Sequence, residues 1–102
     1  MNVLVVAAHA DDEVLGCGGT ILKHVRHGDS VTLVLMTNGV GARYADNEDV
    51  VVQSRRAMSA RAAEIMGIDN VIEFDFPDNQ MDTVPLLFVI QSIERVLAER
   101  TY

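Results

Sequence analysis

The sequence predicts a three-layer α/β fold built on one parallel sheet. Val-rich apolar stretches of strand length alternate three times with longer stretches of helical spacing. Such alternation is typical of parallel strands joined by right-handed helical crossovers. A dense group of polar residues follows the first strand at its carboxyl end, which is where open parallel sheets bind their ligands.

The first strand and helix are expected over residues 2–8 and 15–27. The run Val3, Leu4, Val5 and Val6 is continuously apolar, as in a strand that is buried on both faces. Gly28 predicts a left-handed helix cap. In this helix four residues recur at helical spacing: Leu15, Gly18, Leu22 and Val25.

The second strand is expected over residues 30–36, followed by a turn at 37–39 and a polar loop at 41–49. A second helix follows over residues 50–66 and ends at Gly67. Its apolar face is expected to consist of Val51, Met58, Ala62 and Ile65.

The third strand is expected over residues 71–76, where apolar and acidic residues alternate as in a half-exposed edge strand. A turn at 77–80 leads to a third helix over 85–100, with Pro85 at its first position. Its buried stripe is expected to consist of Leu86, Val89, Ile93 and Leu97.

Composition limits the classes of partner. Fifteen acidic residues against eight basic ones give a net charge of −7, which argues against nucleic acid and anionic membranes. A single cysteine excludes an internal disulfide and favours a reducing, cytoplasmic location. No apolar run approaches the length of a membrane span and no signal peptide is evident, so we expect neither.

The strand order is expected to be 3-2-1, as in one half of a Rossmann-like sheet, which leaves the first strand at an edge. That strand carries no lysine or proline to protect an edge. We therefore expect either a fourth strand from residues beyond Tyr102 or a second chain, in a homo-oligomer, to cover it.

The carboxyl ends of the strands predict a functional site. His9 and Asp12 lie three residues apart on a turn that enters a helix, so an imidazole nitrogen and a carboxylate oxygen can face one point. These are zinc-type ligands, and catalytic zinc usually has three protein ligands and a water. Asp11 would point elsewhere, free to act as a base. Three loops are expected to converge here: residues 9–13, 37–44 and 77–80.

Residues 8–13, Ala-His-Ala-Asp-Asp-Glu, resemble the AHPDDE signature of the PIG-L/LmbE-like zinc N-deacetylases. The resemblance implies that residues 1–102 are the amino-terminal part of a single such domain, truncated before its fourth strand. These enzymes remove acyl groups, usually acetyl, from N-acetylglucosamine-type sugars or their conjugates. Other segments that look like the family are 14–20, 37–39, Arg55, Met66 with Gly67, and 76–79.

The resemblance also implies roles for five residues. His9 and Asp12 match two zinc ligands, and Asp11 matches the general base that takes a proton from the attacking water. Arg55 matches a substrate-contacting arginine, and Asp78 matches an acid that lines the sugar site. Acetate and a free amine would be the products.

The chain departs from the family pattern at three places. Ala10 replaces a proline, which we expect only to loosen the turn. Met58 stands where the family often has a glutamate, so a pairing of that glutamate with Arg55 is not expected. In the family the third zinc ligand comes from a histidine-rich motif after the fourth strand, and residues 1–102 are expected to contain only three strands. With two of the three usual protein ligands, we predict that this chain alone is a poor catalyst.

Other interpretations compete with this one. A phosphoacceptor receiver domain would also place an acidic pair after its first strand and would use Asp78 as acceptor. His9 disfavours a receiver domain, because magnesium prefers oxygen ligands. A receiver domain also needs a lysine after its fifth strand, and Lys23, in the first expected helix, is the only lysine of this sequence. A nucleotide-binding domain lacks its GxGxxG spacing. In structural terms alone, Asp78 could be a turn former, and Arg55 could belong to a solvated helix face.

Overall fold

The computed structural model of the chain describes residues 1–37 and 48–102. It contains one sheet of three parallel strands in the order β1-β2-β3, which confirms the predicted order. The strands are β1 (Asn2–Ala7), β2 (Ser30–Thr37) and β3 (Asn70–Phe76). The helices are α1 (Asp12–Arg26), α2 (Glu48–Met66), α3 (Leu86–Glu99) and a short 3₁₀ helix (Met81–Thr83).

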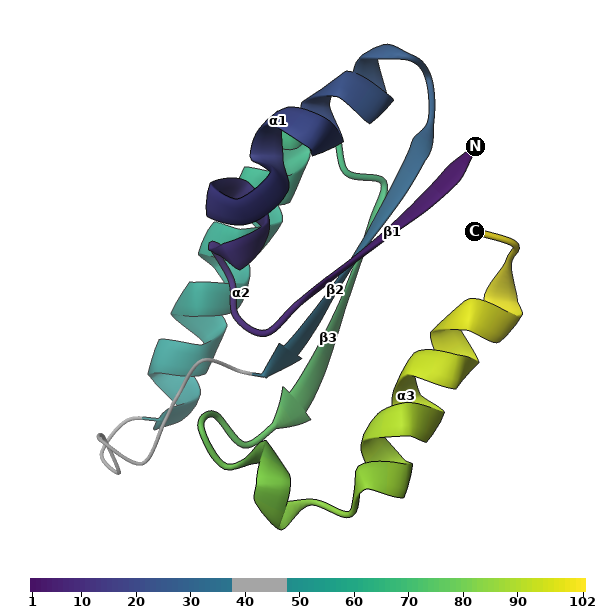
Figure 1. Ribbon diagram of the computed structural model, residues 1–102. Coiled ribbons are helices and arrows are strands. Elements are labelled where there is room, and N and C mark those ends of the chain that lie inside the picture. The colour runs from purple at the N-terminus through teal and green to yellow at the C-terminus, as the bar shows by residue number, and fades with distance from the viewer. Residues whose placement is uncertain (38–47) are drawn as a thin grey trace.

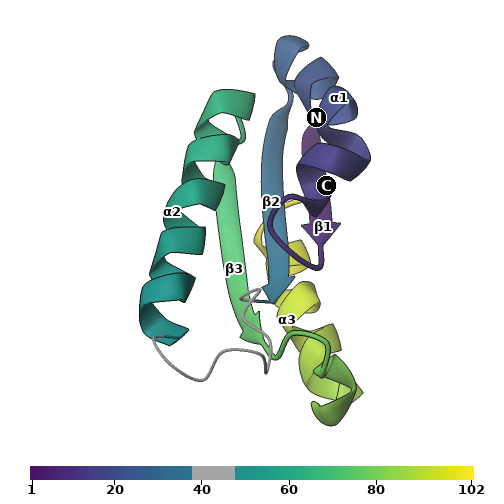
Figure 2. The same cartoon turned by 90° about the vertical axis from the view of Figure 1, so that its left-hand side faces the viewer.

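Helices cover both faces of the sheet, as the three-layer prediction requires. Figure 1 shows α1 and α2 on one face and α3 on the other, and the turned view of Figure 2 shows the same layers. The crossovers through α1 and α2 both advance the chain in one direction along the sheet, so right-handedness puts both helices on one face. The fold is thus α/β and Rossmann-like.

The central strand β2 holds the core. Val31, Leu33 and Leu35 pack in one cluster with Ile21 of α1 and with Ala63 and Met66 of α2. On the opposite face Val34 and Met36 pack with Val96 of α3. Because β2 has a helical layer on each side, its side chains are almost completely buried.

The edge strand β1 is half-buried, which differs from the expectation of burial on both faces. Val6 is 47% exposed, whereas Ala7 is buried under α1 and α2. The difference arises because β1 has a neighbouring strand on one side only, in the sheet that the structure describes. A further strand or second chain covering this edge stays a prediction.

The predicted helix faces are partly wrong, by about one residue of rotation. The α2 side chains that the structure describes do not include Val51; of those described, Ser59, Ala63 and Met66 are buried. Met58 and Ile65 are exposed. In each helix apolar residues stand next to one another, so periodicity alone fits two faces and packing on the sheet selects one. The same shift exposes Leu15 and Leu22 of α1 and Leu86 and Leu97 of α3.

Helix ends follow local backbone chemistry. Gly28 and Gly67 have φ values of 82° and 77°, which confirms the two predicted left-handed caps. Pro85 is the N-cap residue of α3, with a ψ of 128°, and not the first helical residue as expected. Helix α1 begins at Asp12, earlier than expected, and is kinked at Cys17, where φ is −143°.

No helix within residues 1–37 and 48–102 is long and apolar enough to cross a membrane. The cytoplasmic location and the lack of a nucleic-acid partner stay predictions.

Candidate active site

A tight turn after β1 brings His9 and Asp12 together. The Asp12 N–H donates to the His9 carbonyl at 3.2 Å, and the His9 N–H donates to Asp12 Oδ2 at 3.0 Å. Asp11 has a φ of 90° and a ψ of −28°, whereas Ala10 is not among the described residues with positive φ. These features define a type II turn with Ala10 at its second position, where proline is common. The two reciprocal hydrogen bonds close the turn and hold the Asp12 carboxylate against the backbone of His9.

The His9 and Asp12 side chains have the spacing of ligands that share a metal ion. His9 Nδ1 lies 3.4 Å from Asp12 Oδ2. Bond lengths of about 2.0–2.2 Å at a tetrahedral angle separate two zinc ligands by about 3.4 Å, so this donor pair fits zinc. Over residues 1–37 and 48–102, no group of three or more His, Cys, Asp and Glu side chains is arranged to hold a metal ion. The described residues therefore offer two ligands and not a complete catalytic set.

A second turn, after β3, carries Asp78 into the same place. The Gln80 N–H donates to the Pro77 carbonyl at 3.3 Å, and Asn79 adopts a φ of 56°. Asp78 Oδ1 is hydrogen-bonded to His9 Nε2. Two of the three predicted loops thus meet at the carboxyl edge of the sheet.

The His9 ring is held between two carboxylates. The hydrogen bond with Asp78 raises the pKa of the His9 imidazole; partial burial opposes this effect, and Asp12 adds to it. The side chain of Asp78 is only 12% exposed, compared with 38% for His9 and 49% for Asp12. Asp78 is therefore the inner partner of the ring and Asp12 the outer one.

The third predicted loop is described only at its first residue. The Thr37 N–H and hydroxyl both donate to the Ala8 carbonyl, at 3.1 and 2.9 Å. This pair of hydrogen bonds ties the end of β2 to the start of the His9 turn. The rest of that loop, residues 38–44, lies outside the described residues.

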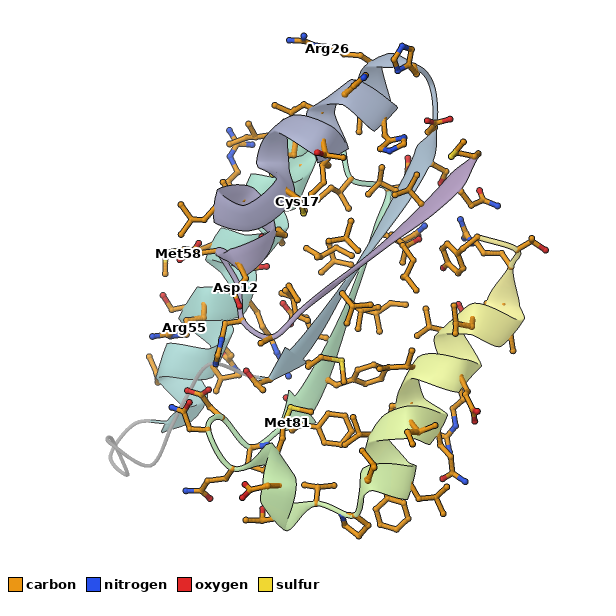
Figure 3. All side chains as sticks on the ribbon, viewed as in Figure 1. Asp12, Cys17, Arg26, Arg55, Met58 and Met81 are labelled. Carbon is orange, nitrogen blue, oxygen red and sulfur yellow. The ribbon has the colours of Figure 1, made fainter. Side chains whose placement is uncertain are left out.

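The two arginines of α2 have different surroundings. Arg56 makes ion pairs with Glu73 at 3.0 Å and Asp75 at 2.5 Å, so it ties α2 to β3. Arg55 lines a small pocket at the carboxyl edge together with Ala10 and other residues. Figure 3 shows Arg55 on the same side of the molecule as Asp12. A contact between Arg55 and a substrate stays a prediction.

The Asp11 carboxylate is exposed beside the pair formed by His9 and Asp12. Among the described residues, no hydrogen bond or ion pair engages its oxygens. The general-base role of Asp11 stays a prediction.

Glu13 is a feature that the sequence analysis missed. It is 3% exposed on the inner face of α1, and its Oε2 has no hydrogen-bond partner among the described residues. A buried polar atom without a partner is costly, so its presence directly after Asp12 is unusual. The signal that could have found it is its place at the end of the acidic motif.

The family of the chain follows from its sequence profile. The profile of the PIG-L family, described as GlcNAc-PI de-N-acetylase, matches residues 4–101. The chain belongs to the PIG-L family. This PIG-L chain is 31% identical over 103 residues to a probable N-acetyl-alpha-D-glucosaminyl L-malate deacetylase 2 of Bacillus cereus, an alignment covering 96% of this chain and 47% of that protein.

The solved structures that resemble this PIG-L chain include two enzymes with different printed activities. The N,N'-diacetylchitobiose deacetylase from Pyrococcus horikoshii matches with a TM-score of 0.69 and 29% identity, over 78% of this chain and 31% of that one. The 4-carboxy-2-hydroxymuconate hydratase from Pseudomonas putida matches with a TM-score of 0.67 and 32% identity, over 78% of this chain and 36% of that one. The chain thus spans half or less of the length of each of these relatives. The receiver-domain alternative gains no support from them.

Proposed function

We propose that this chain carries part of the active site of a zinc-dependent hydrolase, which removes the N-acetyl or another N-acyl group from a glucosamine-type sugar or its conjugate. The proposal rests on the distance of 3.4 Å between His9 Nδ1 and Asp12 Oδ2, next to the exposed residue Asp11. Relatives named as deacetylases of N-acetylglucosaminyl malate and diacetylchitobiose support this substrate class.

The residues of the chain would divide the work as follows. His9 and Asp12 would hold the zinc ion, which when bound supplies Lewis acidity for the amide carbonyl and for the attacking water. Asp11 would take a proton from that water, and a base positioned in this way contributes ~10²–10⁴ in rate. Arg55 and Asp78 would contact the sugar at the wall of the site. Acetate and the free amine would then leave.

Zinc binding by the 102-residue chain tests the first step. We expect isothermal titration calorimetry to show one zinc site in the wild type that is lost in His9→Ala. His27→Ala is the matched control, because His27 lies exposed at the far end of α1, and it should bind zinc like the wild type. Equal zinc affinity of wild type and His9→Ala would overturn the metal assignment.

Product analysis tests the reaction. A form of the protein that turns over should release acetate and a free amine in equal amounts from an N-acetylglucosamine derivative, and it should lose this activity with Asp11→Asn. Hydration of a carbon–carbon double bond is the second candidate, because a hydratase is among the similar structures at 32% identity. Incubation with 4-carboxy-2-hydroxymuconate, followed by its ultraviolet absorbance, separates the two activities.

A further inference from the structure

The two ring nitrogens of His9 face different carboxylates. Nε2 is hydrogen-bonded to Asp78 Oδ1, and Nδ1 lies 3.4 Å from Asp12 Oδ2. A neutral imidazole has one N–H donor and one lone pair, and an ionised carboxylate only accepts hydrogen bonds. The carboxylate that holds the ring more tightly therefore decides which nitrogen carries the hydrogen and which keeps its lone pair.

We propose that Asp78 is a positioning residue, which holds His9 as the Nε2–H tautomer and leaves the Nδ1 lone pair directed to the point shared with Asp12. The inference rests on the proposed zinc site and adds to it the group that orients its histidine ligand. A histidine that binds a metal through one ring nitrogen usually donates its other N–H to a carboxylate, carbonyl or water.

Burial and connectivity make Asp78, and not Asp12, the orienting partner. The Asp78 side chain is 12% exposed and the Asp12 side chain is 49% exposed, so the contact with Asp78 is less weakened by water. Asp12 Oδ2 also accepts a hydrogen bond from the backbone N–H of His9 at 3.0 Å, so the His9 ring is not its only partner.

The backbone around Asp78 supports this role. Asp78 stands in a turn closed by the hydrogen bond from Gln80 to Pro77, which restricts the direction of its side chain. It lies 69 residues from His9 along the chain, so the contact also joins the ends of β1 and β3. The ring is thus fixed by an element other than the turn that carries it.

The tautomer of His9 can be measured without metal. Long-range ¹⁵N–¹H correlation spectra of the metal-free chain, recorded above the pKa of His9, distinguish Nε2–H from Nδ1–H. We expect Nε2–H in the wild type. His24 serves as an internal reference of the opposite kind, because its Nδ1 lies 2.7 Å from Asp29 Oδ2 and should carry the hydrogen.

Substitution of Asp78 provides the decisive comparison. In Asp78→Ala, Asp12 becomes the remaining carboxylate beside the ring, so the His9 signal should move toward Nδ1–H. Zinc affinity should fall about 10–100-fold, the usual cost of losing such a partner. Asp78→Asn should recover part of both properties, because its amide oxygen still accepts a hydrogen bond. Asp82→Ala is the control, since it removes an equal charge from an exposed position nearby.

Three outcomes would overturn the inference: an Nδ1–H tautomer in the wild type, an unchanged tautomer in Asp78→Ala, or equal zinc affinities of Asp78→Ala and Asp82→Ala. Unchanged amide shifts far from the site exclude misfolding of the variants. If the wild type binds no zinc, the proposed function is wrong, and the tautomer measurement alone then decides the role of Asp78.

Discussion

The two turns that form the site have the same backbone plan but use it differently. Each is closed by a hydrogen bond between its first and fourth residues, and each has a positive φ at its third residue: Asp11 in one turn and Asn79 in the other. In the turn after β3 the left-handed position holds an asparagine, and the acid that contacts His9, Asp78, precedes it. In the turn after β1 the left-handed position holds the candidate base itself.

This difference indicates where backbone strain is stored. Asn79 has a φ of 56°, close to the ideal left-handed value of about 57°, whereas Asp11 lies farther from it at 90°. Strained residues persist where the surrounding structure fixes them, and they gather at functional sites. The hydrogen bonds between His9 and Asp12 provide that fixation on either side of Asp11.

The largest expected effect is on catalysis, where a substitution of Asp11 and a substitution of Asn79 should have very different effects on turnover. In a full-length form of the protein that turns over, Asp11→Asn should lower turnover by ~10²–10⁴, because an amide cannot take a proton from water. Its zinc content should not change, since asparagine tolerates a positive φ and both ligands remain. Asn79→Gly should leave turnover almost unchanged. Near-normal turnover of Asp11→Asn, measured as kcat, would remove Asp11 from the mechanism.

A smaller effect is expected on stability when glycine replaces each left-handed residue. Both substitutions remove the steric cost of a side chain at positive φ, which is about 1–2 kcal/mol for an ordinary residue. Asp11→Gly should raise the free energy of unfolding more than Asn79→Gly, because Asp11 is farther from the left-handed minimum. Urea unfolding of both variants measures this, and a larger gain at Asn79 would contradict the assignment of strain to the first turn.

Ala10→Pro would place a proline at the second position of the first turn, whereas the turn after β3 has its proline, Pro77, at the first position. Proline fits the second position of a type II turn and reduces the freedom of the unfolded chain. We expect a gain of about 0.4–1 kcal/mol in the free energy of unfolding. Ala60→Pro, in the interior of α2, is the contrasting variant and should destabilise the chain. A loss of stability in Ala10→Pro would show that the turn is not of type II.

The smallest effect is a pH dependence of the contact between the turns. The pKa of His9 is raised in the folded state, mainly by Asp78, so the protonated ring is the form that folding favours. Its contribution is fully present below the unfolded pKa of 6.5 and is lost as pH rises through the folded pKa. Unfolding free energies of wild type and Asp78→Ala should therefore converge toward alkaline pH. A constant difference across that range would mean that the pair does not titrate with folding.

The sequence predicts the strands better than the helix faces, for a physical reason. For β2 the expected range, residues 30–36, agrees with the observed strand Ser30–Thr37 to within one residue. In α2, Ile65 and Met66 are adjacent, so the pattern cannot tell which of them faces the sheet; Met66 is buried and Ile65 is 70% exposed. Short-range periodicity is insufficient where a helix has apolar residues on more than one side.

The site shows the same division between local and long-range information. The spacing of His9 and Asp12 indicates that their side chains share a point, because the turn that joins them is local. The contact of His9 with Asp78 depends on the relative placement of β1 and β3, which no local pattern encodes. The buried Glu13 escaped prediction because an acidic residue at the start of a helix is ordinarily explained as exposed.

The ends of the chain meet at the opposite edge of the sheet. Asn2 Nδ2 donates to the Thr101 carbonyl at 2.8 Å, and Arg100 Nη1 lies 3.5 Å from Ser30 Oγ. Strand β1 separates this edge from His9 by roughly 20 Å, at about 3.3 Å for each residue. An affinity tag, a fluorophore or a surface linker attached at either terminus would therefore sit a strand's length away from the metal-type ligands. The chain could be immobilised by either end for binding measurements with its candidate site facing the solution.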